Sequence, residues 1–392
     1  MINLPLATGN WDKDEYEAIE RVIKSNYFTM GKEVECFEKN FADYFGVDYA
    51  VMVNSGSSAN LLAIAALVYC NKYNLKPGDE VIVPAVSWAT TYSPLQQYNL
   101  KVKFVDIDLE TLNFSIKKLK EAISDKTKLI FAVNLLGNSN EYDEILKICN
   151  EKDIILLEDN CEAMGAKYNN KYLGTMGVMG TFSTFFSHHI STMEGGMVIT
   201  NDLELRDLMI SIRAHGWTRN LNEESSIYSK KEDDFYETFN FILPGYNLRP
   251  LELEGALGIE QLKKLKNITN NRRENAEFFV KKFSMLKSII IQKEIGQSSY
   301  FGFSLIVKKN ALYSRNDLIK KLKKENVDCR PIVAGNFTRN EVIKYFDYEI
   351  FDELTNADYL HNNGLFIGNH HYDCKEKLGK IYELIRTMES GE

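Results

Sequence analysis

The sequence lacks the features that mark membrane, secreted and nucleic-acid-binding proteins. None of its apolar runs reaches the ~18–20 residues that cross a bilayer, and its start, MINLPLATGNWDKDEYEA, has no basic-then-apolar signal pattern. The formal net charge of −8 does not provide the basic face that phosphate backbones require. We therefore expect a cytoplasmic protein with neither a membrane nor a nucleic acid as partner.

Cysteine and proline are also scarce. The 6 cysteines lie at long, irregular spacings without a C-x-x-C pair, and none occurs between Cys161 and Cys329. Because zinc and iron–sulfur sites need clustered thiolates, we expect neither a metal ion nor an iron–sulfur cluster. The thiols are expected to be reduced and mostly buried. With 7 prolines and 44% hydrophobic residues, the composition is that of an ordinary globular enzyme.

Up to residue 200, short apolar runs alternate with amphipathic helical stretches, such as the one from Ser57 to Asn71. This alternation predicts an α/β fold, in which helices cover a mostly parallel sheet. The seven predicted strands are Tyr49–Val53, Glu80–Pro84, Lys101–Asp106, Leu129–Asn134, Ile154–Glu158, Gly180–Phe185 and Gly196–Thr200.

The pattern changes from Leu248 onward. A long helix is predicted through ELEGALGIEQLKKLKNITNNRRENAEFFVKKF, which has apolar spacings of three and four. A strand (Tyr300–Val307), a Lys-rich helix (Arg315–Asn326) and a final helix (Lys375–Met388) are predicted after it. Since 392 residues exceed one usual core, we predict a large domain (1–247) and a smaller α+β domain (248–392) that the N-terminal arm contacts. The polar, acidic segment 220–236 is predicted to be an exposed loop.

A candidate phosphate site is Asn54-Ser55-Gly56-Ser57-Ser58, which follows a strand and opens a helix. Glycine allows close backbone approach, and a helix N-terminus offers unpaired N–H groups to an anion. A serine-capped helix without any ligand has the same sequence pattern. Both interpretations stay open at this point.

Two further residues lie at strand ends. Trp88 follows the second strand, at the edge where parallel sheets bind ligands, and is either a stacking platform or a core tryptophan. Asp159 ends a strand beside Asn160 and Glu162. Its carboxylate would keep a pyridinium nitrogen protonated, or it caps a helix.

Cations gather in two short stretches. Asn247 and Arg249 lie just before the long helix, and Arg213, His215 and Arg219 lie in IRAHGWTRN. Guanidinium groups suit bidentate contacts with carboxylates or phosphates, although a single arginine is more often a surface charge.

The segment GTFSTFFSHHISTMEGGMVIT carries His188 and His189. His188 alone would be interpreted as a packed core histidine. A metal site formed with His189, or with the pair His370 and His371, is disfavoured because adjacent extended residues point to opposite faces.

Taken together, the order and spacing of these segments resemble the DegT/DnrJ/EryC1/StrS family of nucleotide-sugar aminotransferases. The resemblance runs from NYFTMG, near residue 26, to the closing helices. It implies the aspartate-aminotransferase-like fold, type I among the pyridoxal phosphate enzymes, and a homodimer with shared active sites. The roles it implies are phosphate binding by Gly56, Ser57 and Ser183, ring stacking by Trp88, pairing of Asp159 with the pyridine nitrogen, a place for Glu162 near the ring hydroxyl, and contact of Asn247 with the neighbouring subunit's phosphate site.

The family pattern is SF-x-x-x-K, and an acidic-Gly-Gly hairpin begins six residues after its lysine. This sequence departs from that pattern at one position. Counting back six from Glu194 gives His188, and no lysine occurs between Lys171 and Lys230. A lysine there would hold the cofactor covalently. An imidazole, with a pKa near ~6.5, suits a proton shuttle instead.

Within the family, the histidine in place of this lysine makes the sequence resemble the sugar 3-dehydratases. It implies non-covalent pyridoxal and pyridoxamine phosphate, L-glutamate as amino donor, and His188 as the base. The implied substrate is a GDP-linked 4-keto-6-deoxy sugar, GDP-4-keto-6-deoxymannose, which would lose its C3 hydroxyl with release of ammonia and 2-oxoglutarate. A CDP-sugar branch with an iron–sulfur cluster is disfavoured because clustered cysteines are lacking.

Alternatives to dehydration are a nucleotide-sugar 4-aminotransferase and a non-catalytic relative that only binds cofactor or sugar. Substrate carboxylate or diphosphate contacts are expected from His215, Arg219, Arg249 and Arg330.

Overall fold

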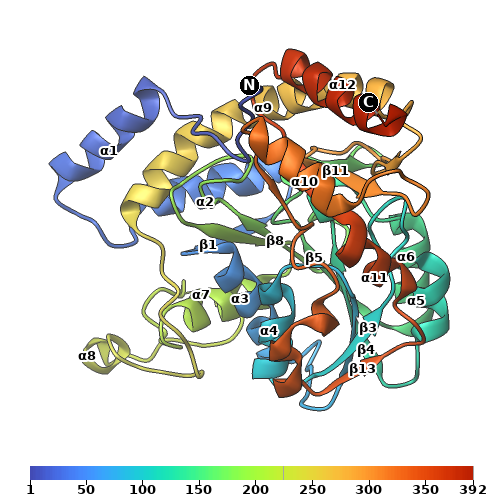
Figure 1. Cartoon of the computed structure of the whole chain (residues 1–392). Coiled ribbons are helices and arrows are strands. Elements are labelled where there is room, and N and C mark those ends of the chain that lie inside the picture. The colour runs from blue at the N-terminus through green and yellow to red at the C-terminus, as the bar shows by residue number, and fades with distance from the viewer. Residues whose placement is uncertain (224, 392) are drawn as a thin grey trace.

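The computed structural model describes residues 1–223 and 225–391. Its largest element is an eight-stranded sheet in the order β1-β9-β8-β5-β4-β2-β3-β13 (Figure 1). The strands are β1 (Tyr49–Val53), β2 (Glu80–Pro84), β3 (Lys101–Val105), β4 (Thr127–Val133), β5 (Ile155–Asp159), β8 (Met179–Ser183), β9 (Gly196–Thr200) and β13 (Tyr348–Ile350). β9 runs antiparallel to both β1 and β8, whereas the other pairs in this sheet are parallel.

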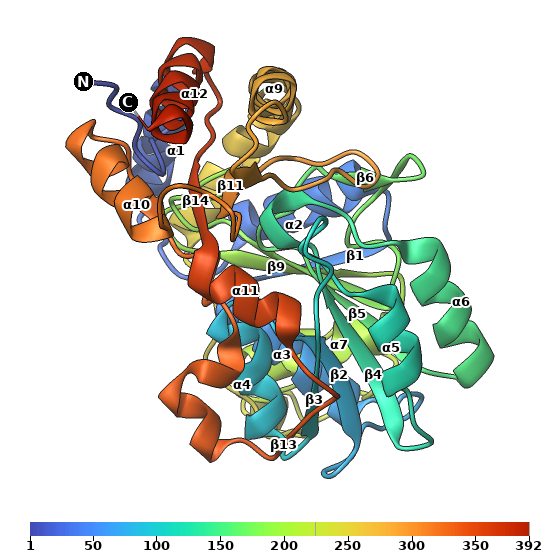
Figure 2. The same ribbon diagram turned by 45° about the vertical axis from the view of Figure 1, so that its right-hand side comes forward.

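The helices are α1 (Lys13–Ser25), α2 (Lys32–Phe45), α3 (Gly56–Tyr69), α4 (Ala89–Gln97), α5 (Ile116–Ala122), α6 (Tyr142–Lys152), α7 (Leu203–Arg213), α8 (Asp234–Glu237), α9 (Glu252–Phe283), α10 (Arg315–Lys324), α11 (Thr355–Asn363) and α12 (Lys375–Ser390). Helices α5 and α6 cover one face of the large sheet, while α3, α4 and α7 cover the other (Figure 2). Every residue of β2, β8 and β9 is buried, as expected of strands covered on both faces.

Helix α3 is the central helix of this arrangement. From Ala59 to Leu67 every residue except Leu61 is buried, because the helix packs on β8 and β9 and is covered by α4 and α7. A helix that is apolar all round is stable in water only inside such a layer. Its N-terminus is therefore held firmly at the carboxyl end of β8.

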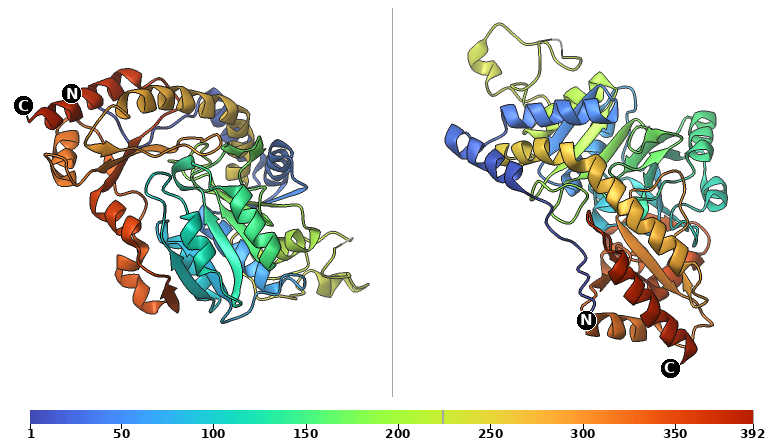
Figure 3. Two further views of the ribbon diagram at one scale, coloured as in Figure 1. Left: turned by 90° about the vertical axis from the view of Figure 1, so that its right-hand side faces the viewer. Right: turned by 90° about the horizontal axis from the view of Figure 1, so that it is seen from above.

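The C-terminal part forms a second, four-stranded antiparallel sheet, β10 (Ile289–Ile290), β11 (Gly302–Val307), β14 (Gly364–Gly368) and β12 (Cys329–Arg330), in that order. Its core contains stacked Phe279 and Phe303 rings, with centroids 4.2 Å apart. Ile2 and Leu4 of the N-terminal arm are buried in the same core. From there the arm runs as an extended chain to α1 (Figure 3). A small two-stranded sheet joins β6 (Lys167–Tyr168) to β7 (Lys171–Tyr172).

The expected α/β architecture is confirmed, and all seven predicted strands are present within about two residues of their expected bounds. The sheet has one strand more than predicted. Strand β13 comes from the C-terminal part of the chain and pairs in parallel with β3. It was missed because three residues are too short to show a period.

The segment predicted as a loop, 220–236, is irregular except for the start of α8, and its residue 224 lies outside the described part of the chain. Across residues 1–223 and 225–391, none of the helices is long and apolar enough to cross a membrane.

Candidate active site

The N-terminus of α3 forms a small anion cradle with the end of β8. Ser55 caps the helix, since its hydroxyl accepts the Ser58 N–H at 3.0 Å. A Cβ at Gly56 would lie 2.6 Å from the Cβ of Ser183, so only glycine lets the helix approach the strand this closely. Ser57 donates its hydroxyl to Thr90 at 2.9 Å. The serine cap is confirmed, and it does not exclude anion binding by the remaining N–H groups of the first turn, which stays a prediction.

Asp159 is a buried carboxylate at the carboxyl end of β5, with 5% of its surface exposed. Its Oδ2 accepts hydrogen bonds from Asn60 Nδ2 at 2.9 Å and Thr91 Oγ1 at 2.7 Å. Its Oδ1 accepts the backbone N–H of Cys161 at 3.1 Å. The alternative of a helix cap is wrong, because an irregular turn follows β5.

The neighbouring Glu158 points to the other side of the strand and anchors it. It is fully buried and accepts the backbone N–H groups of Gly174, Met176 and Gly177. Buried carboxylates persist when several donors satisfy them. Glu158 thereby fixes the strand end that carries Asp159.

Glu162 is half-buried beside Asp159. Its Oε2 accepts the N–H of Leu136 at 2.8 Å, within a turn where Leu136 has a positive φ of 53°. Desolvation raises the pKa of Glu162 to about 7. This carboxyl group is therefore able to gain or lose a proton near neutral pH.

Trp88 caps the start of α4 without being part of the core. Its side chain is 59% exposed, so the alternative of a core tryptophan is wrong. The exposed indole lies one turn before Thr91, whose hydroxyl binds Asp159. An aromatic face is therefore available to a planar ligand at the same sheet edge.

His188 lies in the loop that joins β8 to β9. Its backbone N–H donates to Phe185 O at 2.9 Å, and its ring centroid is 5.2 Å from that of Phe301. Nδ1 is buried and has no partner among the residues described, which leaves Nε2 as the open nitrogen. Desolvation, together with the buried Arg272 guanidinium, lowers the pKa of His188 to about 4, so the ring is neutral at pH 7.

The buried histidine of this pair is His189, not His188. His189 is 1% exposed, and its Nε2 lies 3.1 Å from Ser299 O. In the described parts of the chain, no group of three or more His, Cys, Asp or Glu is arranged to hold a metal ion. His189 is therefore the packed ring of the pair, whereas His188 keeps one nitrogen without a protein partner.

Three of the predicted substrate-binding residues lie around Trp217, a residue that the sequence analysis did not single out. The ring of His215 lies 5.2 Å from the Trp217 ring, and the guanidinium groups of Arg219 and Arg249 each lie 5.6 Å from it. Asn247 joins the cluster by accepting Arg249 Nε at 3.1 Å. The sequence did contain a sign of this cluster, because the segment IRAHGWTRN places a tryptophan between His215 and Arg219, and guanidinium groups stack on indoles.

Two arginines stand apart from this cluster. Arg213 is buried and donates to Glu38 Oε1 and to Met52 O, each at 2.5 Å, so it is structural. Arg330 is exposed on β12 and makes no hydrogen bond to the other site residues in the portion of the chain described.

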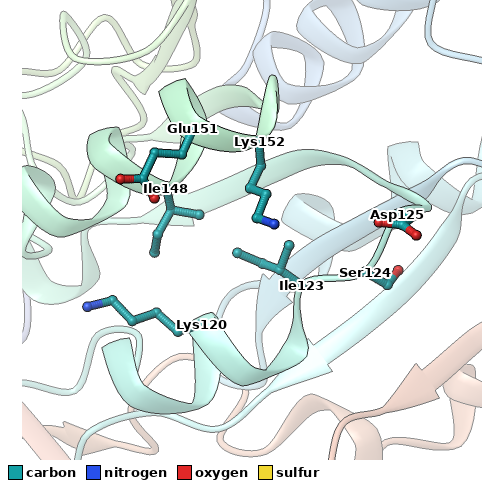
Figure 4. A pocket seen from close by; sticks show the side chains of 7 residues that line it. All are labelled: Lys120, Ile123, Ser124, Asp125, Ile148, Glu151 and Lys152. Carbon is teal, nitrogen blue, oxygen red and sulfur yellow. The ribbon is translucent and has the colours of Figure 1, made fainter.

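The hollow shown in Figure 4, of about 200 Å³, lies between α5 and α6 and is separate from these residues. Two lysines border it, and one of them, Lys120, already pairs with Glu144 at 2.5 Å. It contains none of the predicted site residues.

The residues at the sheet edge fit a pyridoxal phosphate group. Gly56 lets the N-terminus of α3 approach Ser183 closely, and Asp159 is a carboxylate pre-oriented by three donors. An exposed indole and an imidazole with one open nitrogen complete the set. These are the phosphate, ring-nitrogen and ring-face contacts that such a cofactor requires.

The chain is similar to known proteins over nearly its whole length. The chain is 58% identical over 388 residues to the GDP-4-keto-6-deoxy-D-mannose 3-dehydratase of Yersinia pseudotuberculosis, covering 98% of this chain and 99% of that protein. The solved structure of the Escherichia coli GDP-4-keto-6-deoxy-D-mannose-3-dehydratase with bound hydrated PLP matches with a TM-score of 0.96, at 56% identity and 98% and 99% coverage. A structure of GDP-4-keto-6-deoxymannose-3-dehydratase with a trapped PLP-glutamate geminal diamine matches with a TM-score of 0.96, at 55% identity and 97% and 100% coverage.

The family model described as the DegT/DnrJ/EryC1/StrS aminotransferase family matches residues 10–386. The match spans the anion cradle, the carboxylate of β5 and the His188 loop. The chain therefore belongs to the DegT/DnrJ/EryC1/StrS aminotransferase family.

Proposed function

We propose that this protein is a pyridoxal phosphate- and glutamate-dependent 3-dehydratase of a GDP-linked 4-keto-6-deoxyhexose. The substrate is GDP-4-keto-6-deoxy-D-mannose, and the products are the 3,6-dideoxy-4-keto sugar, ammonia and 2-oxoglutarate. The observation that carries this proposal is His188, an imidazole in place of a lysine within an otherwise complete cofactor site. The 58% identity to a 3-dehydratase over nearly the whole chain supports the choice of substrate.

We assign the phosphate to the N–H groups at the start of α3 and to the hydroxyl of Ser183. Asp159 would hold the pyridine nitrogen protonated, Trp88 would cover one ring face, and Glu162 would lie near the ring hydroxyl. When bound, the cofactor supplies an amine, taken from glutamate, and an electron sink. Except for Glu162, which lies in the turn after β5, the polar protein groups in this set come from helix and strand ends, which keeps the ring in one orientation.

We assign proton transfer during loss of the C3 hydroxyl to Nε2 of His188. The ring is neutral, so it is ready to accept a proton, and its other nitrogen is closed off by burial. Having no ε-amino group, residue 188 leaves the cofactor free of a covalent bond to the protein. His188 would therefore not compete with the substrate for the cofactor's reactive carbon.

We also propose a homodimer with shared sites. Several large apolar side chains are exposed in the single chain, among them Trp88 and, in the His188 loop, Phe185 and Phe186. The Trp217 cluster presents Asn247, the His215 ring and the guanidinium groups of Arg219 and Arg249. In this proposal Asn247 reaches the partner's phosphate site, and His215, Arg219, Arg249 and Arg330 contact the sugar diphosphate or the glutamate carboxylates.

The division into domains 1–247 and 248–392 and a cytoplasmic location complete the proposal. All 6 cysteines are free thiols, which suits a reducing compartment.

A panel of nucleotide-linked 4-keto-6-deoxy sugars, incubated with the protein, cofactor and glutamate, tests the proposal. We expect one ammonia per sugar and a product lacking the C3 oxygen, with the GDP-linked mannose derivative preferred over CDP- and dTDP-linked sugars. A product that keeps nitrogen at C4 would instead identify a 4-aminotransferase. Binding of cofactor without turnover of any sugar would identify a non-catalytic relative.

A further inference from the structure

We infer that the N-terminal arm and helix α9 together position the proposed base. Asn10 and Trp11 of the arm and Gln261 of α9 hold the loop that carries His188. This inference rests on the proposed function of His188, but its structural part is measurable without substrate. The three residues lie outside the cofactor cradle and outside the Trp217 cluster, so they are positioning residues rather than catalytic ones.

The loop from Thr184 to Gly195 needs external support at its tip. Its own backbone bonds join Thr184 N to Gly195 O, Thr192 N to Thr184 O, and Phe186 N to Met193 O. They close the base of the loop but leave the peptide groups just after His188 unpaired. Those groups are buried, since His189 is 1% and Ser191 3% exposed, and buried peptide groups require partners.

The N-terminal arm supplies two of these partners. Asn10 Nδ2 donates to His189 O at 3.3 Å, and Trp11 Nε1 donates to Ser191 O at 3.0 Å. The two accepting carbonyl groups belong to residues one and three positions after His188. The arm is thus tied across the segment that sets the direction of the imidazole.

Helix α9 supplies the third partner. Gln261 is fully buried, and its Oε1 accepts the N–H of Ser191 at 2.9 Å while its Nε2 donates to Glu15 Oε1 at 2.7 Å. Glu15 is itself fully buried and accepts Lys264 Nζ at 2.7 Å. Because the Glu15 carboxylate only accepts, it fixes which way the Gln261 amide faces, and so directs the carbonyl oxygen to Ser191.

The far end of the arm is anchored beside the four-stranded sheet, in the core that Leu4 and Val327 share. Leu4 forms a bridge with Val327, and His370 Nε2 lies 3.0 Å from Pro5 O. Figure 3 shows the extended arm running between these contacts and α1. The position of the His188 loop therefore depends on residues nearly 180 positions away in the sequence. A displacement of about 1 Å at a reacting group is enough to reduce a rate by up to ~100-fold.

The test uses Trp11→Phe, which removes the indole N–H but keeps an aromatic ring, and Asn10→Ala as a second variant. Arg21→Gln is the control, because it breaks the exposed Arg21–Glu33 pair of α1 without touching the loop. We expect kcat to fall roughly tenfold in Trp11→Phe and less in Asn10→Ala, with KM for the sugar and the cofactor affinity within about twofold of wild type.

Two measurements on the cofactor-free protein separate positioning from general destabilisation. Hydrogen exchange should accelerate at the amides of residues 188–192 and stay unchanged elsewhere. With only 6 histidines in the chain, labelled-histidine NMR should show shifts for His188 and His189 and not for the rest.

An unchanged kcat, a parallel loss of cofactor affinity, exchange that rises throughout the chain, or the same effect in Arg21→Gln would each overturn the inference. If the protein does not dehydrate any sugar, the proposed function fails, whereas the exchange and NMR results still decide whether the arm holds the loop.

Discussion

A histidine with one nitrogen buried and the other open exchanges protons only through the open nitrogen. At position 188 the buried Nδ1 faces no acceptor among the described residues, so the ring has no charged partner that would hold it as an imidazolium. The lowered pKa, about 4, means that protonation is transient unless the bound ligands supply negative charge. Such a group relays a proton rather than storing one.

His188→Lys is expected to lower the dehydration rate at least ~100-fold, because it removes the relay and offers an amine that binds the cofactor covalently. Borohydride reduction followed by mass measurement should show one cofactor attached to the variant and none to the wild type. Dehydration at the native rate in the variant would contradict the assignment of the base.

Glu162 makes a separate prediction about stability and pH. Its pKa is raised to about 7 in the folded chain, from 4.5, so its contribution to stability is fully present below pH 4.5 and is lost as pH rises through 7. Relative to Glu162→Gln, the cofactor-free wild type should lose roughly 2 kcal/mol of unfolding free energy between pH 5 and pH 8. Urea unfolding at the two pH values measures this difference, and a constant difference would show that Glu162 does not titrate in this window.

At the scale of elements, the junction of α3 with β8 decides whether an anion fits. The helix N-terminus has the dipole and the open N–H groups, but they are useful only because Gly56 lets Ser183 approach. Two effects compete when this glycine is changed. Alanine favours the helix by ~0.5–1 kcal/mol, whereas its Cβ at 2.6 Å from Ser183 forces the helix and strand apart.

Gly56→Ala is therefore expected to weaken cofactor binding more than tenfold, because the steric effect outweighs the helix propensity. The matched control is Gly379→Ala in α12, where the nearest atom, Phe278 Cζ, would lie at 3.7 Å from the new Cβ. The control should keep cofactor affinity and gain a little thermal stability. Cofactor titration and thermal unfolding of both variants measure the two effects, and equal affinities would remove the cradle from the cofactor site.

At the scale of the whole molecule, the candidate residues other than Arg330 form two groups. One group lies at the carboxyl edge of the large sheet, and the other surrounds Trp217 on the segments before and after α8. Large aromatic side chains are exposed beside both groups, Trp88 in the first and Phe241, which pairs with Trp217, in the second, and they are the basis of the proposed homodimer.

A mixing experiment tests whether sites are shared. The variants His188→Asn and Asn247→Ala should each be inactive or weak alone at limiting cofactor. When their subunits are exchanged, the mixture should recover up to about one quarter of wild-type activity. The reason is that a mixed dimer contains one site in which both residues are native. Mixed dimers seen by native mass spectrometry without any recovery of activity would place His188 and Asn247 in the same subunit's site.

From sequence alone, local patterns determined the strands, the long helix and the order of the site segments. Those features depend on spacing, on caps and on the alternation of apolar residues, all of which are local. They also made His188 the conspicuous position, since the lysine gap and the six-residue offset to Glu194 are visible in the chain itself.

Only the tertiary structure decided which residues meet. Strand β13 was too short to predict, Trp217 became the centre of the cation cluster through packing, and Arg213 proved to be buried against Glu38. The support of His188 by Trp11 and Gln261 depends on contacts that span about 180 and about 70 residues. Such long-range hydrogen bonds leave no periodic trace in a sequence, because they form only when the sheet and the helices around it are in place.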